Sequence, residues 1–275
     1  MRFVLIIILI SILKLNSTAQ TVTEWFPPEL NLQPFTAHFL EPKTGFQYLF
    51  DLQKVRIDIG TSHDIIHWKV EDESFSFGAD FFTYTRARSE DNFKFPVETV
   101  DYLFGVNGSY KRKNQQSEWG ARLRFSHISA HLVDGYYDIE SQSWLGEREP
   151  FVYSREFFEL IAYYKFYGIR LYGGLTYNIH IVPDEIKKGM LQVGFDYYVT
   201  QIQTSVFVPF IAYDFKLTGI EEYKGNNIIS AGIKFGQPES RGFSILASYF
   251  SGKSVHGEFY DLNESYATIG INLDI

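Results

Sequence analysis

The stretch Thr99–Lys111, with the sequence T-V-D-Y-L-F-G-V-N-G-S-Y-K, decides the fold of this chain. Apolar or aromatic residues recur at nearly every second position from Val100 to Tyr110, and most positions between them are polar. Successive side chains of a strand point to opposite faces, so this period predicts a β-strand with one apolar and one polar face. The same alternation recurs at 191–199 and 267–275, and a helical period is hard to find anywhere. The chain is therefore predicted to be all-β.

Alternating segments of this kind fill the chain from residue 55 onward. There are about twelve of them, beginning near Val55, Ile65, Phe75, Thr99, Trp119, Tyr153, Ile169, Gly189, Ser205, Asn226, Gly242 and Tyr266. Strands in soluble sheets are usually about 5–6 residues long, whereas strands that cross a membrane need about 9–11. The segments are long and carry Phe and Tyr near both ends of their apolar faces. They favour a transmembrane antiparallel up-and-down β-barrel over the alternative, a soluble β-sandwich.

The lengths of the connections provide a separate test of these two architectures. Short links are expected at 71–74, 113–117, 167–168, 201–204 and 237–240, and longer links at 87–98, 133–152, 181–188, 217–225 and 252–265. Only the first link, at 61–64, breaks the alternation of short and long. A bacterial outer-membrane barrel has short periplasmic turns and longer outer loops, so the alternation favours the barrel.

The composition excludes several classes of protein. The 275 residues contain no Cys, which excludes a disulfide scaffold, a thiolate metal site and a cysteine nucleophile. Asp and Glu (33) outnumber Lys and Arg (25), giving a net charge of −8, and a nucleic-acid binder would need a basic face. Aromatic residues make up 18% of the chain, and they pack well on the pleated surface of a sheet.

The N-terminal part divides into two expected segments that precede the barrel. Residues 1–19 resemble a secretory signal peptide: Arg2 is followed by an apolar run and then by small residues, although a buried N-terminal helix or strand is an alternative. Residues 20–53 contain a cluster of prolines, which cannot join a central sheet, and are expected to form a periplasmic segment that packs against or partly plugs the barrel. Residues 54–275 are expected to form the barrel. No later stretch is apolar over 18 residues, which argues against spanning helices.

The polar faces of the strands are expected to point into the barrel. Their charged members are five acids and five bases: Asp80, Asp101, Glu159, Asp196, Asp214, Arg122, Arg124, Lys165, Lys216 and Lys234. A barrel of about twelve strands is narrow enough for long side chains to meet. Together with the bulky Phe157, Tyr163 and Phe250, these charges predict a filled lumen with structural ion pairs; a conducting pathway is the less favoured alternative.

Three residues spaced two apart form the most informative candidate site. His127, Ser129 and His131 share one face of a strand, and the register places that face on the lipid side. A histidine near a serine, oriented by a carboxylate, is the general arrangement for hydrolysing an ester through an activated hydroxyl. Glu140 is the candidate acid and Asp134 the alternative. The same residues could instead form a polar network that holds the 133–152 loop in place.

Two resemblances bear on this segment. The His127-Ile128-Ser129 spacing resembles the His-x-Ser of the lipid A 3-O-deacylases, outer-membrane barrels whose catalytic His and Ser face the outer leaflet and are completed by a Glu. This resemblance implies a serine-type lipid esterase or deacylase in which Glu140 occupies the position of the acid.

The second resemblance covers more of the chain. The run Arg124–Asp134, R-F-S-H-I-S-A-H-L-V-D, resembles the Arg-x-x-His-x-Ser-Ser-His-Leu-Gly-Asp signature of the bacterial envelope family known as domain of unknown function 1207. Phe95-Pro96-Val97 with Asp101-Tyr102, and the run Tyr249–Tyr260, support it. The resemblance implies an outer-membrane barrel and implies no activity.

The remaining histidines are weaker candidates. His180, on an inward register, and His256, in the last outer loop with Glu258 and Asp261, could ligate a metal, but hydrogen bonding at the rim is the simpler interpretation. No metal or cofactor is expected. The sequence thus predicts an exported barrel of the Gram-negative outer membrane that hydrolyses lipid acyl esters at the outer leaflet. The alternative is a non-enzymatic barrel that is structural, ligand-binding or a narrow channel.

The expected partners follow from this location. They are outer-membrane lipid or lipopolysaccharide, and the barrel-assembly machinery during insertion. Nucleic acid is not among them.

Overall fold

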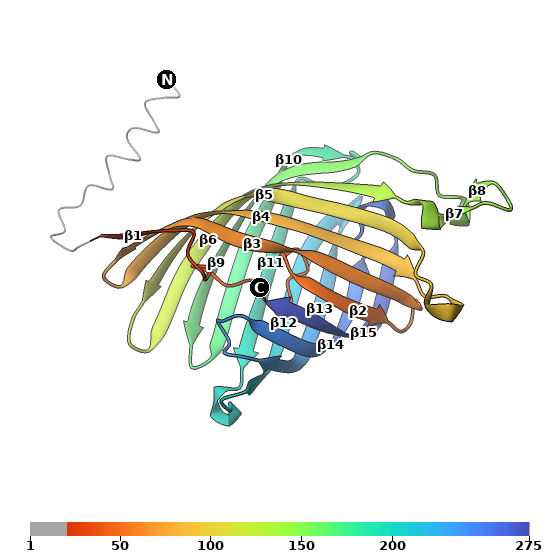
Figure 1. Cartoon of the computed structure of the whole chain (residues 1–275). Coiled ribbons are helices and arrows are strands. Elements are labelled where there is room, and N and C mark those ends of the chain that lie inside the picture. Colours follow the sequence, from red (N-terminus) through yellow and green to blue (C-terminus); the bar gives the residue numbers. More distant parts are fainter. Residues whose placement is uncertain (1–20, 275) are drawn as a thin grey trace, which may run out of the picture.

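The strands of this chain close into an antiparallel barrel, as a computed structural model that describes residues 21–274 shows (Figure 1). Twelve strands form the ring, because β2 pairs with both β15 and β3. In ring order they are β2 (Thr44–Leu49), β3 (Lys54–Val70), β4 (Glu73–Arg88), β5 (Val97–Lys113), β6 (Ser117–Leu132), β9 (Tyr153–Phe166), β10 (Ile169–Val182), β11 (Gly189–Tyr198), β12 (Phe207–Ile220), β13 (Glu222–Phe235), β14 (Gly242–Lys253) and β15 (Asn263–Asp274). The prediction of an all-β barrel of about twelve strands is confirmed.

Smaller elements lie outside the ring. β1 (Val22–Trp25) pairs with residues 66–69 of β3. β7 (Tyr137–Asp138) pairs with β8 (Ser143–Trp144) in a hairpin beyond the barrel. The helical elements are single 3₁₀ turns: η1 (Asp91–Phe93), η2 (Asp134–Tyr136), η3 (Leu145–Glu147), η4 (Thr200–Ile202) and η5 (Gly257–Phe259). Within residues 21–274 no helix has the length and apolar character needed to cross a membrane.

The two faces of each strand differ as the alternation predicts. On β5 the outward Phe104 is 52% exposed, whereas its inward neighbour Leu103 is fully buried. Outward Leu123 on β6 and Leu160 on β9 are likewise about half exposed. Large apolar side chains thus cover the outside of the wall, where they match the hydrocarbon of a bilayer.

The prediction for the first two strands was wrong. The segments expected near Val55 and Ile65 form the single strand β3, and the twelfth wall strand is β2, which lies within the range expected for the periplasmic segment. A bulge between Asp64 and Ile66 shifts the pairing of β3 with β4. An extra residue interrupts the alternation of faces, so one long strand has the sequence pattern of two short ones.

A second connection also differs from its prediction. The long link expected at 217–225 is a turn of one residue, Glu221, between β12 and β13. Glu221 has a φ of 58°, in the left-handed region that tight turns use. The longest link, 133–152, lies at the end where long loops were predicted. We call this end the outer end and the opposite end the periplasmic end.

The segment between β1 and β2 runs inside the barrel. β1 pairs with residues 66–69 of β3 and β2 pairs with residues 54–58, so the chain leaves the wall between them. Leu32, Phe35 and Leu40 of this segment are at most 6% exposed. Residues 26–43, which we call the lumenal segment, therefore fill the periplasmic half of the bore.

Ion pairs fix the lumenal segment to the wall. Both terminal nitrogens of the Arg122 guanidinium donate to the Glu41 carboxylate, at 2.8 and 2.5 Å. Arg124, which is fully buried, contacts Glu41 at 3.2 Å, Asp80 at 2.9 Å and Glu159 at 3.3 Å. Burial by itself would raise the pKa of Glu41, but the two guanidinium groups hold this pKa well below its usual value.

The inward charges predicted from the sequence are confirmed. All ten lie on inward registers, and all except Lys165 at the periplasmic rim are buried. Phe157, Tyr163 and Phe250 are buried among them. The prediction of a lumen filled by paired charges and bulky side chains is thus confirmed.

The outer end of the bore is closed by the 254–262 loop, which folds back into the barrel. His256 and Phe259 of this loop are at most 2% exposed. The His256 ring bonds the Asp101 carboxylate (Nδ1 to Oδ2, 2.8 Å), and the Arg86 guanidinium lies 3.7 Å from the centre of the Phe259 ring. With both ends occupied, the surfaces left for function are the outer wall, the outer loops and the periplasmic mouth.

Candidate active site on the outer wall

Two neighbouring strands, β6 and β9, bring the candidate site together. They pair antiparallel, so that His127 lies opposite Glu156 and Ser129 lies opposite Ser154. All four residues are on outward registers near the outer end of the barrel. The expected placement of His127, Ser129 and His131 on the outward face is what the structure has.

A carboxylate orients the His127 ring. Its Nδ1 lies 2.6 Å from Oε1 of Glu156, and both side chains are 27% exposed. A carboxylate accepts and cannot donate, so Nδ1 carries the proton and donates it. Nε2 then holds the lone pair that a general base needs. The Phe104 ring, 4.9 Å away between centroids, packs against the imidazole and limits its rotation.

His180 bonds the other oxygen of the same carboxylate. Its Nδ1 lies 2.6 Å from Oε2 of Glu156, and its side chain is 60% exposed. The sequence predicted an inward register for His180, and this was wrong. A bulge between Asn178 and His180 inserts one extra residue, which turns His180 from the lumen to the outer wall. One acid on β9 thereby joins histidines from β6 and β10.

Ser129 completes the face without a hydrogen bond. Nothing in residues 21–274 bonds its hydroxyl, and its neighbour across the strand pair on β5 is Tyr102. The Tyr102 ring packs edge-on against His131, at 5.9 Å. His127 and Ser129 are two residues apart on one face, so both side chains project into the same outside environment.

A family model matches most of the barrel part of the chain. The family model "Protein of unknown function (DUF1207)" matches residues 97–274. The chain belongs to this family. The match begins with β5 and ends with β15, and it includes His127, Ser129 and Glu156.

The fold resembles that of an outer-membrane protein of solved structure. The outer membrane phospholipase A from Escherichia coli matches with a TM-score of 0.57 at 10% identity, over 85% of this chain and 92% of that one. The β-domain of the Bordetella autotransporter BrkA matches with a TM-score of 0.41 at 10% identity, over 84% of this chain and 97% of that one. Among curated protein sequences none matches the chain. The fold of this family member is that of an outer-membrane β-barrel.

The two acids expected from the sequence, Glu140 and Asp134, lie away from His127 in the 133–152 loop. Glu140 is exposed in the β7–β8 hairpin, where its backbone N–H donates to Asp138 (2.9 Å). Asp134 is exposed at the start of η2. The structure brings neither of them to His127, whose carboxylate partner is Glu156. Reasoning from the sequence missed Glu156 because it followed one strand into its loop, whereas the acid comes from the adjacent strand.

The weak metal candidates do not come together. His180 lies outside the wall and His256 is inside the lumen against Asp101. Within residues 21–274 no cluster of three or more His, Asp or Glu side chains has the geometry of a metal site. The outward cluster is instead a set of hydrogen bonds in which Glu156 holds the His127 ring. Nε2 of this ring has no partner within residues 21–274, and Ser129 lies two residues away on the same face.

Proposed function

We propose that this protein hydrolyses acyl esters of outer-membrane lipids, with Ser129 as the nucleophile, His127 as the general base and Glu156 as the acid that orients it. The observation that carries the proposal is the 2.6 Å bond from His127 Nδ1 to Glu156 on the outward face, next to a serine on the same face. A polar cluster toward lipid costs free energy, so its presence there favours a functional role.

The chemistry follows from the proton positions. His127 Nε2 takes the proton of the Ser129 hydroxyl as Oγ attacks the ester carbonyl carbon, and a tetrahedral intermediate forms. The imidazolium then gives this proton to the departing alcohol, which leaves the acyl group on Oγ. Water, deprotonated by Nε2, releases the fatty acid and restores Ser129. The carboxylate of Glu156 stabilises the imidazolium in both steps. Rotation of the serine side chain toward Nε2 is required, and such bonds often tighten only when substrate binds.

The location of the cluster indicates the substrate class. It lies on the outside of the wall toward the outer end, while the bore behind it is filled. A substrate must therefore approach laterally from the outer leaflet, which makes outer-membrane lipid or lipopolysaccharide the expected partner. The E. coli neighbour is a phospholipase by name, but at 10% identity the likeness concerns the fold, and the proposal depends on the residues of this chain.

A second candidate function is a non-enzymatic barrel that serves as a rigid envelope scaffold or binds a ligand. The buried ion pairs between the lumenal segment and the wall favour it, since they make the barrel a solid body. On this alternative, the His127–Glu156–His180 cluster only ties three strands together at the rim.

Turnover by purified protein in mixed micelles distinguishes the two. The substrate is a phospholipid with a fluorogenic acyl ester, and lipid A with mass-spectrometric detection is assayed in parallel. Ser129→Ala and His127→Ala are expected to lose about 10³-fold or more of the wild-type rate, as expected for members of a nucleophile–base pair.

The matched control is Ser154→Ala, which removes the hydroxyl directly opposite Ser129 on β9 and should keep the wild-type rate. Folding of each variant is checked by the shift in gel mobility between unboiled and boiled samples. If hydrolysis persists in both Ser129→Ala and His127→Ala while these variants are folded, the proposed hydrolase is excluded and the non-enzymatic barrel is favoured.

A further inference from the structure

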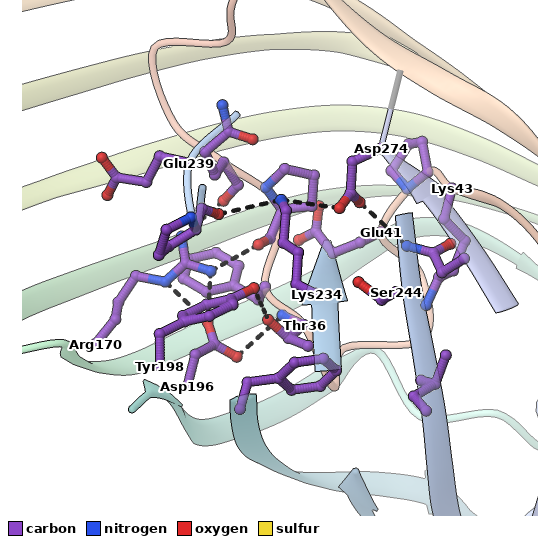
Figure 2. Close-up of a pocket in the computed structure, with 18 of the residues that line it drawn as sticks. Thr36, Glu41, Lys43, Arg170, Asp196, Tyr198, Lys234, Glu239, Ser244 and Asp274 are labelled. Atoms are coloured by element: carbon purple, nitrogen blue, oxygen red, sulfur yellow. Dashed lines mark hydrogen bonds and ion pairs between the residues drawn. The ribbon is translucent and has the colours of Figure 1, made fainter. Parts of the chain in front are cut away.

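Among the cavities beside the lumenal segment, one lies at the periplasmic mouth and is lined by Lys43 and Arg170 (Figure 2). Its open volume is about 900 Å³, including the part that continues into the opening. Its lining combines the end of the lumenal segment with residues of β10, β11, β13, β14 and β15. Because the outer end is closed by the 254–262 loop, this cavity is reached from the periplasmic side.

One half of the cavity is occupied with holding the lumenal segment. The Arg170 guanidinium donates to the backbone oxygens of Gln33 (2.8 Å) and Pro34 (2.6 Å). Arg170 also pairs with Asp196, which accepts the backbone N–H of Thr36 at 3.0 Å. Figure 2 shows these side chains directed at the segment. Their hydrogen-bonding groups are engaged, so this half is structural.

The other half surrounds Lys43, a basic group without a carboxylate of its own. No ion pair or hydrogen bond joins its ammonium to any residue in 21–274. The nearby acids are already paired: Glu41 with Arg122 (2.8 Å), Asp58 with Arg56 (2.7 Å) and Asp274 with Lys234 (2.9 Å).

Burial, and then the positive charge of Arg56, lower the pKa of Lys43 to about 8. A positive charge is thus costly at this position in the empty cavity. An anion bound next to it would remove this cost.

Neutral donors face the same space. The Ser244 hydroxyl is buried and forms no hydrogen bond within residues 21–274. The Gln47 amide accepts from Thr268 through its oxygen (3.1 Å), which leaves its NH₂ group to donate. Figure 2 shows Lys43 and Ser244 at the same end of the cavity. One cation and two neutral donors are the groups that a carboxylate or phosphate needs.

A smaller space continues from this end into the barrel. It has an open volume of about 440 Å³ and shares Thr36, Lys43, Gln47 and Leu246 with the first cavity. Its lining includes the hydroxyls of Ser230 and Ser248, which bond each other at 2.8 Å, and the apolar Leu246. This mixed lining can accept the organic part of a ligand whose acid group is held at Lys43.

We propose that the periplasmic mouth of the barrel binds an oxyanion, the carboxylate or phosphate group of a small periplasmic solute, between Lys43, Ser244 and Gln47. This site is separate from the wall cluster, since it opens at the opposite end and inside the barrel. It does not depend on lipid hydrolysis.

Protection of Lys43 from acetylation tests the site in the wild-type protein. The protein in detergent micelles is treated with acetic anhydride at pH 8, and peptide mass spectrometry measures modification at each lysine. Sodium butyrate and inorganic phosphate are the probes, and sodium chloride at equal ionic strength is the reference. An anion that raises the pKa of Lys43 by one unit lowers its reactive amine fraction by up to about tenfold, so a slowing of several-fold is expected.

Lys188, exposed at the outer end, serves as the internal control and should react at the same rate in every salt. Stronger protection by butyrate identifies an organic acid as the ligand, and stronger protection by phosphate identifies a phosphate. Equal acetylation of Lys43 in butyrate, phosphate and chloride overturns the proposal.

A variant tests whether the neutral donors take part. Ser244→Ala removes one donor while leaving Lys43 in place, and it should require several-fold more butyrate or phosphate for the same protection. Unchanged protection in folded Ser244→Ala contradicts the assignment of this donor and, with it, the site as proposed.

Discussion

The same two strands supply two ionic clusters that face opposite environments. On their inward faces, β6 and β9 contribute Arg124 and Glu159 to the network around Glu41. On their outward faces they contribute His127 and Glu156, three residues away on each strand. Both clusters pair carboxylates with nitrogen donors. They differ in the environment they face, which is the packed lumen for one and the outside of the wall for the other.

The two clusters differ in burial, since the inner side chains are at most 5% exposed whereas His127 and Glu156 are each 27% exposed. Inside, Glu41 receives two guanidinium groups and a histidine, and Arg124 divides its nitrogens among three acids. Outside, each imidazole gives Glu156 one bond and keeps its second nitrogen free. A buried network of paired charges stabilises a structure, whereas a partly exposed cluster with a free, oriented nitrogen can also exchange protons. The inner network is therefore expected to control stability, and the outer one activity.

The largest expected effect is on stability, from Glu41→Ala. The substitution leaves Arg122 and Arg124 buried without their central carboxylate, and breaking a buried pair in this way costs about 3–5 kcal/mol. The measurement is the urea midpoint for unfolding in lipid vesicles. Glu239→Ala is the matched control, because Glu239 pairs with Lys165 at the exposed periplasmic rim, where the loss is about 0–1 kcal/mol. Equal midpoints for the two variants would contradict a stabilising inner network.

The next effect is on turnover, from Glu156→Gln. The amide keeps the shape of the side chain but cannot stabilise an imidazolium, so lipid hydrolysis should fall by about 10²-fold or more. The unfolding midpoint should change by less than about 1 kcal/mol, since the side chain is partly exposed. A fall in stability with unchanged turnover would reverse the roles assigned to the two clusters.

A third carboxylate, Glu258 in the loop that closes the outer end, is buried and forms no side-chain ion pair within residues 21–274. Burial raises its pKa to about 7, and its Oε2 has no hydrogen-bond partner in the described chain. A raised pKa means that the closed loop favours the neutral acid. The stability of the closed loop should fall as the pH rises from about 4.5 to about 7, and stay low above that.

Hydrogen exchange of the 254–262 amides, corrected for the intrinsic rate at each pH, measures this stability. Protection in the wild type, relative to Glu258→Gln, should be greater at pH 5 than at pH 8 by about tenfold or more, because the shift from about 4.5 to about 7 exceeds one pKa unit. The comparison with Glu258→Gln is needed because burial lowers the pKa of His256 in the same loop, which costs stability below pH 6.5 in both proteins. A ratio that does not vary with pH would show that Glu258 is ionised in the closed loop.

Regular alternation allowed most of the fold to be predicted from the sequence. The period of two in strands such as β5, β11 and β15 gave the faces correctly, including the inward charges. The errors lie where one residue breaks that period. The bulge at Asp64 made β3 look like two strands, and the bulge before His180 reversed its face. A bulge has no sequence signature in a single chain, since it depends on the pairing with the neighbouring strand.

The candidate site was predicted in part for a related reason. His127 and Ser129 are close in sequence, so their spacing alone places them on one face. Glu156 comes from the next wall strand, and its pairing with His127 depends on a register that crosses the 133–152 loop. A signal was present: Glu156 alternates with Phe158 and Leu160, a carboxylate on an otherwise apolar face. Such an acid among outward apolar residues is the feature to look for in other barrels.

The smallest expected effect separates the two choices of acid. Glu140→Ala should leave both the unfolding midpoint and lipid hydrolysis unchanged, within about 0.5 kcal/mol and twofold, because Glu140 is exposed and takes part through its backbone N–H. Side-by-side assays with Glu156→Gln measure the contrast directly. If Glu140→Ala lost turnover and Glu156→Gln did not, the β7–β8 hairpin would have to fold onto the wall during catalysis, and the acid would come from that hairpin rather than from the adjacent strand.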